Sequence, residues 1–316
     1  MKRILDYVWP LIGFAAVAFS GWLLFREIRH LSASDIVASI ELIPASHWGL
    51  AILSTLIAYL ALAWYDRIAL LHLERPLGWG FISLVSFTTY ALSHNIGASV
   101  VSGAAVRYRA YSTKGLSAAE IGVLVALCSF TFGLGTVMLG GFVLLGEPTI
   151  VARLYDLPVE LGRSIGIGLL CLVALYVAGS VFGFRPRKFG KLTLVYPKLP
   201  IVARQLLAAP LELLGAAGII YFALPESGNP GFAVVAGVFL ASFSAALLSN
   251  APGGLGVLEF VFLKAMPDIP AAQVIAALLV FRLLYLLVPL AFASIVVVIF
   301  ERQKLLDAIK SRAKES

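Results

Sequence analysis

Charged residues inside long apolar runs are the side chains of this sequence most able to do chemistry. Glu259 follows a Pro-Gly-Gly turn, Arg282 lies within the run Ala271–Phe300, and Glu212 lies within the run Ile201–Leu224. Because a charge inside a bilayer is costly, such residues tend to face a partner, a polar cavity or a transported group. We expect Glu259 and Arg282 to pair, either along a substrate path or as a contact that only fixes helix packing. We expect Glu212 to face the same cavity or to bond to a neighbouring helix.

Two arginines follow a polar, glycine-containing interruption of another apolar run. Arg107 and Arg109 come directly after the stretch Ser93–Gly103. An arginine fork suits a phosphate group, whereas ordinary basic anchoring at a membrane surface would use the same residues. Both interpretations stay open. We also expect Asp66 and Arg67 to form an interfacial pair.

The two interruptions themselves predict broken helices. Pro removes a backbone donor and Gly weakens a helix, and backbone freed in this way must be buried in protein or line a wet cavity. A plain kink in a spanning helix is the alternative. The expected turn residues are Pro252, Gly253, Gly254 and Gly256. Polar residues at the breaks have two possible roles: they hydrogen-bond the backbone groups that the breaks leave unpaired, or they contact a lipid headgroup. These residues are His94, Asn95 and Asn250.

Composition restricts the class of protein. The hydrophobic fraction is 60%, the charged fraction is 13% and the mean hydropathy is +0.96. These values exclude a soluble domain and favour an all-α, polytopic helical membrane protein. The net charge of +7 then indicates loops that face anionic lipid rather than nucleic acid. Cys128 and Cys171 lie in apolar runs as small fillers, and no residue spacing predicts a metal, nucleotide or hydrolase site, so we expect no cofactor.

The apolar runs predict six full spans. An interfacial helix is expected over Ser34–Leu42, and Ser117 to Glu120 matches a capping box. The expected spans are Val8–Phe25, Trp48–Leu71, Glu120–Gly146, Ser164–Phe184, Ile201–Leu224 and Ala271–Phe300.

Basic residues predict how the two interrupted stretches run. If both cross fully, 11 basic residues lie on the cytoplasmic side and 12 outside. If both enter and return to the same face, Arg282 is in the membrane and five of the 24 basic residues lie outside, which leaves 18 inside. The positive-inside rule favours these re-entrant hairpins, with both termini cytoplasmic. The five outside residues are Arg26, Arg29, Arg153, Arg163 and Lys264.

The spacing of the runs predicts an inverted repeat within a single transmembrane domain, residues 1–316. The first set starts near Trp48, Trp79 and Glu120, and the second starts near Ile201, Gly231 and Ala271, at offsets of 153, 152 and 151. One span separates the sets, so they run in opposite directions, as in many transporters. We expect repeat A over 48–146 and repeat B over 201–300, with no soluble catalytic domain.

Two motifs resemble a known family. Ser93-His94-Asn95-Ile96-Gly97, Gly103 to Tyr111, and Gly115-Leu116-Ser117 look like the flippase region of the bacterial multiple peptide resistance factor, a lysylphosphatidylglycerol synthase and flippase. Asn250 to Glu259 together with Arg282 to Tyr285 resembles a signature of the wider lysylphosphatidylglycerol synthase transmembrane superfamily. The resemblance implies movement of phospholipids, such as aminoacylated ones, between leaflets of the bacterial inner membrane. The expected absence of an aminoacyl-transfer domain argues against synthase activity.

The expected function is therefore a multi-pass lipid flippase rather than an enzyme, with membrane phospholipids as its partners. Two alternatives stay open: a membrane subunit of a lipid-headgroup aminoacyltransferase and a non-transporting scaffold. The sequence is compatible with a homo-oligomer and with a separate lipid-modifying enzyme as a partner.

Overall fold

A computed structural model describes residues 33–96, 99–155, 157–184, 187–189, 192–194, 196–249 and 255–299. Five of its helices are long and apolar enough to cross a membrane. They are α3 (Ala45–His72), α6 (Ala118–Gly146), α8 (Val159–Val181), α9 (Leu199–Ala223) and the helix Ala271–Ile299, which contains α12 (Ala271–Phe281). They match five of the six predicted spans, while Val8–Phe25 lies outside the described residues.

The predicted breaks separate pairs of shorter helices. α4 (Trp79–Ile96) ends and α5 (Ser99–Tyr111) begins on either side of residues 97–98, and the two helices pack on each other. Likewise α10 (Phe232–Ser249) packs on α11 (Val257–Ala265) across the second break. Asn250 and the turn residues Pro252, Gly253 and Gly254 lie outside the described residues. The last turn residue, Gly256, has a φ of +80° and stands at the N-terminal end of α11.

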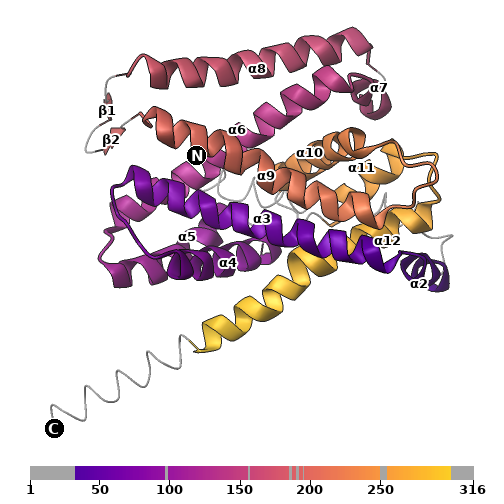
Figure 1. Ribbon diagram of the computed structural model, residues 1–316, viewed down its shortest axis with the longest axis horizontal. Helices are drawn as coiled ribbons and strands as arrows, with labels where there is room; N and C mark the ends of the chain where they lie inside the picture. Colours follow the sequence, from indigo (N-terminus) through magenta and orange to yellow (C-terminus); the bar gives the residue numbers. More distant parts are fainter. Residues whose placement is uncertain are drawn as a thin grey trace, which may run out of the picture.

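The centre of the molecule is the contact of α3 with α9, which run in opposite directions (Figure 1). Small residues allow their backbones to approach, as is common between membrane helices. A Cβ added at Gly215 would lie 2.9 Å from the carbonyl oxygen of Ser54, and one at Gly218 would lie 2.8 Å from the Ser54 hydroxyl. α6 approaches α9 just as closely, because a Cβ at Gly135 would lie 2.5 Å from that of Ala209.

The two helix pairs lie at opposite ends of the α3–α9 contact (Figure 1). At one end Arg75, just after α3, pairs with Glu120 at the start of α6 at 2.7 Å. Glu74 pairs with Lys198, which caps α9, at 3.7 Å. The segment that contains α4 and α5 therefore leaves α3 and enters α6 at one end of the molecule.

The segment that contains α10 and α11 behaves in the same way at the other end. His47, at the start of α3, bonds the carbonyl oxygen of Phe222 near the end of α9 at 2.9 Å. A Cβ at Gly228, just after α9, would lie 2.7 Å from the carbonyl oxygen of Asp268, just before α12. Both helix pairs thus start and finish at a single end, and the two ends differ.

Smaller elements complete the fold. The predicted surface helix is α2 (Ala33–Glu41), which packs against α12, and the Ser117 capping box is confirmed. Several elements were not predicted. They are the short 3-10 helix η1 (Ser112–Lys114), α7 (Thr149–Tyr155), the antiparallel hairpin of β1 (Arg187–Phe189) with β2 (Leu192–Leu194), and the π-helix η3 (Arg282–Leu287), which interrupts the helix Ala271–Ile299. π-Helical turns are frequent at functional sites, so the side chains of η3 are candidates for a functional site.

Candidate functional site

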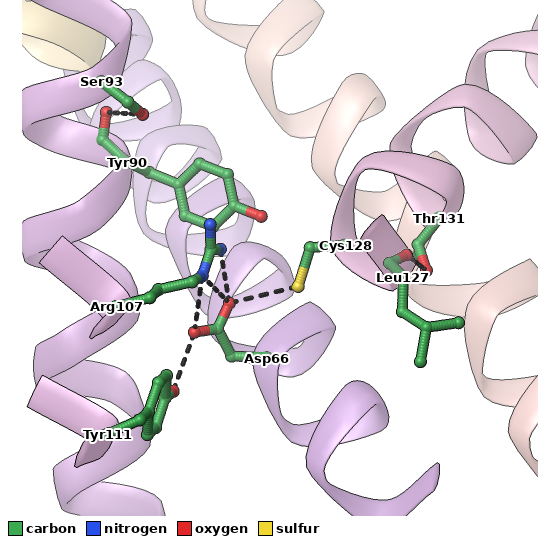
Figure 2. A network of polar contacts seen from close by, with 8 residues as sticks. All are labelled: Asp66, Tyr90, Ser93, Arg107, Tyr111, Leu127, Cys128 and Thr131. Carbon is green, nitrogen blue, oxygen red and sulfur yellow. Dashed lines mark hydrogen bonds and ion pairs between the residues drawn. The ribbon is translucent and has the colours of Figure 1, made fainter. Parts of the chain in front are cut away.

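Arg107 on α5 is held by Asp66 on α3. Its Nη2 atom lies 2.6 Å from Oδ1, and its Nε atom lies 3.2 Å from both carboxylate oxygens. Arg107 is 4% exposed and Asp66 is fully buried. Figure 2 shows the two side chains facing each other between their helices. This ion pair ties α5, the second helix of the first helix pair, to the long apolar helix α3.

Two further side chains donate hydrogen bonds to the Asp66 carboxylate. The Tyr111 hydroxyl donates to Oδ2 at 2.8 Å, and the Cys128 thiol donates to Oδ1 at 3.4 Å. The Arg107 guanidinium also lies over the ring of Tyr90, 4.8 Å from its centroid. Cys128 is therefore more than the apolar filler that the sequence suggested. These donors satisfy the hydrogen-bonding capacity of the buried carboxylate.

The structure corrects two expectations about this region. Asp66 does not pair with Arg67, whose guanidinium lies over the Trp79 ring at 4.6 Å. Arg107 and Arg109 do not form a fork, because Arg107 is buried against Asp66 while Arg109 is exposed. Both errors have one cause: the residues lie on helices, where neighbours at i+1 and i+2 do not share a face.

The predicted pair of Glu259 with Arg282 is present. The Arg282 Nη2 and Nε atoms lie 2.5 and 2.9 Å from Glu259 Oε1, across α11 and η3. The other carboxylate oxygen, Oε2, accepts the backbone N–H of Gly256 at 2.8 Å. Glu259 is 6% exposed and Arg282 is 9% exposed. A second ion pair therefore ties α11, in the second helix pair, to the long apolar helix Ala271–Ile299.

Glu212 lies near the middle of α9 and is 1% exposed. The Tyr285 hydroxyl on η3 donates to its Oε1 at 2.7 Å, and the Tyr65 hydroxyl on α3 lies 3.5 Å from Oε2. Among the described residues, no lysine, arginine or histidine forms an ion pair with Glu212. This arrangement matches the alternative in which Glu212 bonds to neighbouring helices.

The polar residues before the first break contact the last span. The Asn95 amide donates to the carbonyl oxygen of Ala91 at 2.8 Å and to that of Leu286, in the π-helix, at 3.1 Å. The His94 ring stacks on Tyr285 with centroids 5.3 Å apart. Asn95 thus satisfies backbone groups, one of the two roles predicted for it, whereas Asn250 lies outside the described residues.

Acidic and basic groups of the site therefore form two ion pairs, with Glu212 as a third buried acid. Within the described parts of the chain, no group of three or more metal-ligating side chains gathers. Sequence reasoning missed Asp66, Tyr65 and Tyr285 as site residues. The position of Asp66 in an apolar run could have identified it as a site residue. The adjacent Arg67 led instead to the prediction of an interfacial pair.

Comparison with known proteins shows which family the chain belongs to. No family model matches the chain. It is 31% identical over 278 residues to the uncharacterized protein slr0712 of Synechocystis, covering 87% of this chain and 86% of that protein. It is also 31% identical over 261 residues to the inner membrane protein YbhN of Escherichia coli, covering 82% and 80%. The chain belongs to the same family as YbhN.

The chain also has a more distant similarity to a protein with an enzyme's name. This chain is 25% identical over 292 residues to the phosphatidylglycerol lysyltransferase of Bacillus subtilis. The match covers 90% of this chain but only 33% of that enzyme. Together with the five apolar helices, membership of the YbhN family identifies a membrane-embedded protein.

Proposed function

We propose that this protein moves phospholipids between the leaflets of the bacterial inner membrane. The observation that carries the proposal is the pair of buried ion pairs, Arg107 with Asp66 and Arg282 with Glu259. Each joins the second helix of a short hairpin to a spanning helix. Charges inside a membrane are expensive, and they commonly mark the path of a polar substrate.

The hairpins supply the path. Each starts and finishes at one end of the molecule, which supports two re-entrant elements that enter from opposite faces of the membrane. In this proposal they belong to an inverted repeat of 48–146 and 201–300. Broken helices of this kind form the substrate sites of many transporters. A headgroup passes along the polar residues of the two tips while the acyl chains stay in lipid.

The similarity to a phosphatidylglycerol lysyltransferase supports a phospholipid as the substrate class. Phosphatidylglycerol and its lysyl ester are therefore the first lipids to test. The net charge of +7 fits a cytoplasmic face rich in basic loops, with the N- and C-termini on that side. Arg109, which is exposed in the last turn of α5, is the basic residue that we expect to contact a lipid phosphate.

The test is transport by the purified protein in liposomes. Fluorescent phosphatidylglycerol, lysylphosphatidylglycerol and phosphatidylcholine are each placed in both leaflets, and an impermeant quencher reports how fast lipid from the inner leaflet becomes accessible. We expect faster exchange than in protein-free liposomes for at least one anionic or aminoacylated lipid. Equal rates with and without protein for every lipid would refute the proposal. Mass spectrometry of the same lipids tests the alternative that the protein assists headgroup chemistry.

A further inference from the structure

Glu212 differs from the other two buried acids of the site. Asp66 and Glu259 each face an arginine, whereas Glu212 receives only tyrosine hydroxyls among the described residues. It stands 13 residues into the 25-residue helix α9, which places it about 20 Å from the helix start at 1.5 Å per residue. That depth is close to the middle of a bilayer, where an uncompensated charge is most costly.

The partners of Glu212 suit both of its protonation states. A tyrosine hydroxyl can donate to a carboxylate and can also accept a hydrogen bond from a carboxylic acid. Arginine can only donate, so it holds an acid in the charged form. Tyr285 donates to Oε1 at 2.7 Å. Tyr65 donates to the carbonyl oxygen of Ala209 at 3.2 Å, and its hydroxyl oxygen lies 3.5 Å from Oε2, where it can accept a hydrogen bond from protonated Glu212. Glu212 therefore keeps a hydrogen-bond partner in both protonation states.

The other groups around α9 have partners of their own. From α3, Tyr59 donates to the carbonyl oxygen of Tyr285 at 2.9 Å, and Asp66 is bound to Arg107. From η3, Arg282 binds Glu259. From α6, Cys128 donates to Asp66, and from α8, Tyr176 donates to Gln205 at 2.7 Å. The remaining neighbours, α10 and α12, contain no titratable residue. No described cation is thus placed to neutralise Glu212.

Two helix irregularities lie beside this contact. Pro210, two residues before Glu212, lacks the N–H that would continue the α9 hydrogen-bond ladder. Tyr285 belongs to the π-helix η3, and the carbonyl oxygens of Tyr285 and Leu286 accept bonds from Tyr59 and Asn95. Helices interrupted in this way can change their local register, so the contact of Glu212 with Tyr285 is a suitable point for a conformational change.

We propose that Glu212 is a proton-binding site and that its protonation and deprotonation are coupled to lipid movement. The proton comes from water on one side of the membrane, binds a carboxylate oxygen of Glu212, and leaves to water on the other side after the helices rearrange. No electron transfer is involved. The coupling rests on the lipid transport proposed above, whereas proton binding by Glu212 can be tested without it.

The first experiment detects the proton. Infrared difference spectra of the reconstituted protein are recorded between about pH 5 and about pH 9, a range that covers most shifts of carboxyl groups in proteins. We expect a protonated-carboxyl band that appears at low pH in the native protein, is lost in Glu212→Gln, and moves in frequency in Tyr285→Phe. Glu120→Gln is the matched control, because Glu120 is an acid at the exposed start of α6 and its loss should leave the band in place. A pH series with no band sensitive to Glu212→Gln would overturn proton binding.

The second experiment tests coupling. Proteoliposomes with the membrane voltage held at zero receive a gradient of one pH unit, and the leaflet distribution of the transported lipid is measured. If one proton accompanies each lipid, the gradient should shift the ratio between leaflets by up to about tenfold. Lipid exchange that ignores the gradient would overturn the coupling and leave the proposed transport standing. Absence of any lipid exchange would refute the transport itself, and the infrared result would still decide whether Glu212 binds a proton.

Discussion

Arg107 on α5 donates to Asp66 on α3 through two nitrogen atoms, with the shortest distance 2.6 Å, although the two residues are 41 positions apart in the chain. The contact fixes the second helix of the first hairpin against the centre of the molecule. Arg282 and Glu259 make an equivalent contact in the second half. Arg107 and Glu259 are also separated by 152 residues (259 − 107), which equals the offset between the predicted starts of the two interrupted stretches, Trp79 and Gly231.

The Arg107–Asp66 pair should stabilise the fold. Removal of one member leaves an uncompensated buried charge, which costs about 3–5 kcal/mol. Arg107→Gln and Asp66→Asn should therefore each lower the midpoint of thermal unfolding in detergent. Arg107→Lys should recover only part of the loss, since lysine cannot contact both oxygens in the same way. Unchanged midpoints in the Gln and Asn variants would contradict a structural role for the pair.

Arg109 should behave differently from Arg107. Its side chain is exposed, so Arg109→Gln should leave the unfolding midpoint within a degree or so while lowering the rate of lipid exchange. Arg107→Gln should lower both quantities. Parallel measurements of stability and exchange on the two variants separate the roles. If Arg109→Gln exchanges lipid at the native rate, Arg109 serves only as a basic anchor.

Much of the fold could be predicted from the sequence because apolar run length and helix breakers are local signals. The five long apolar helices and the two helix pairs at the breaks follow from them. The π-helix η3 and helix α7 have no comparable local signal. The partner of Arg107 could not be predicted, because it depends on how α5 meets α3. The Glu259–Arg282 pair could be predicted, because Arg282 is the one arginine deep in an apolar run and few acidic residues were candidates for its partner.

The Glu259–Arg282 pair should be energetically coupled. Glu259→Gln and Arg282→Gln should each slow lipid exchange and lower stability, because each leaves a buried charge alone. The double variant should lose less than the sum, with a coupling of about 0.5–3 kcal/mol for residues in contact. A double-mutant cycle on the unfolding free energy measures this value. Strictly additive effects would show that the contact carries no coupling.

Close packing of α6 on α9 should depend on Gly135. A Cβ there would lie 2.5 Å from Ala209 Cβ and 2.9 Å from the Ala209 carbonyl carbon, so a neighbouring backbone must move. Gly135→Ala should destabilise the protein by about 1–3 kcal/mol through overpacking. Gly133→Ala on the same helix is the matched control, since a Cβ there meets nothing within 4 Å. Equal stability of the two variants would contradict the described helix contact.

The ends of the molecule should face opposite sides of the membrane. Cysteines placed at Lys114 and Lys198, on the end where α6 and α9 begin, should resist an impermeant thiol reagent applied to intact cells. A cysteine at Glu226, on the opposite end, should react. The exposed native Cys171 is first replaced with serine. Labelling of Lys114→Cys and Glu226→Cys from the same side would rule out re-entrant hairpins.

Movement of lipid between leaflets is the central claim, and one comparison tests it most directly. Exchange of fluorescent phosphatidylglycerol or its lysyl ester is measured in liposomes that contain equal amounts of native protein, Gly133→Ala or Arg282→Gln, each verified as folded by its unfolding transition. We predict that the native protein and Gly133→Ala exchange lipid several-fold faster than protein-free liposomes, and that Arg282→Gln falls towards the protein-free rate. Equal rates in all four preparations would contradict the claim.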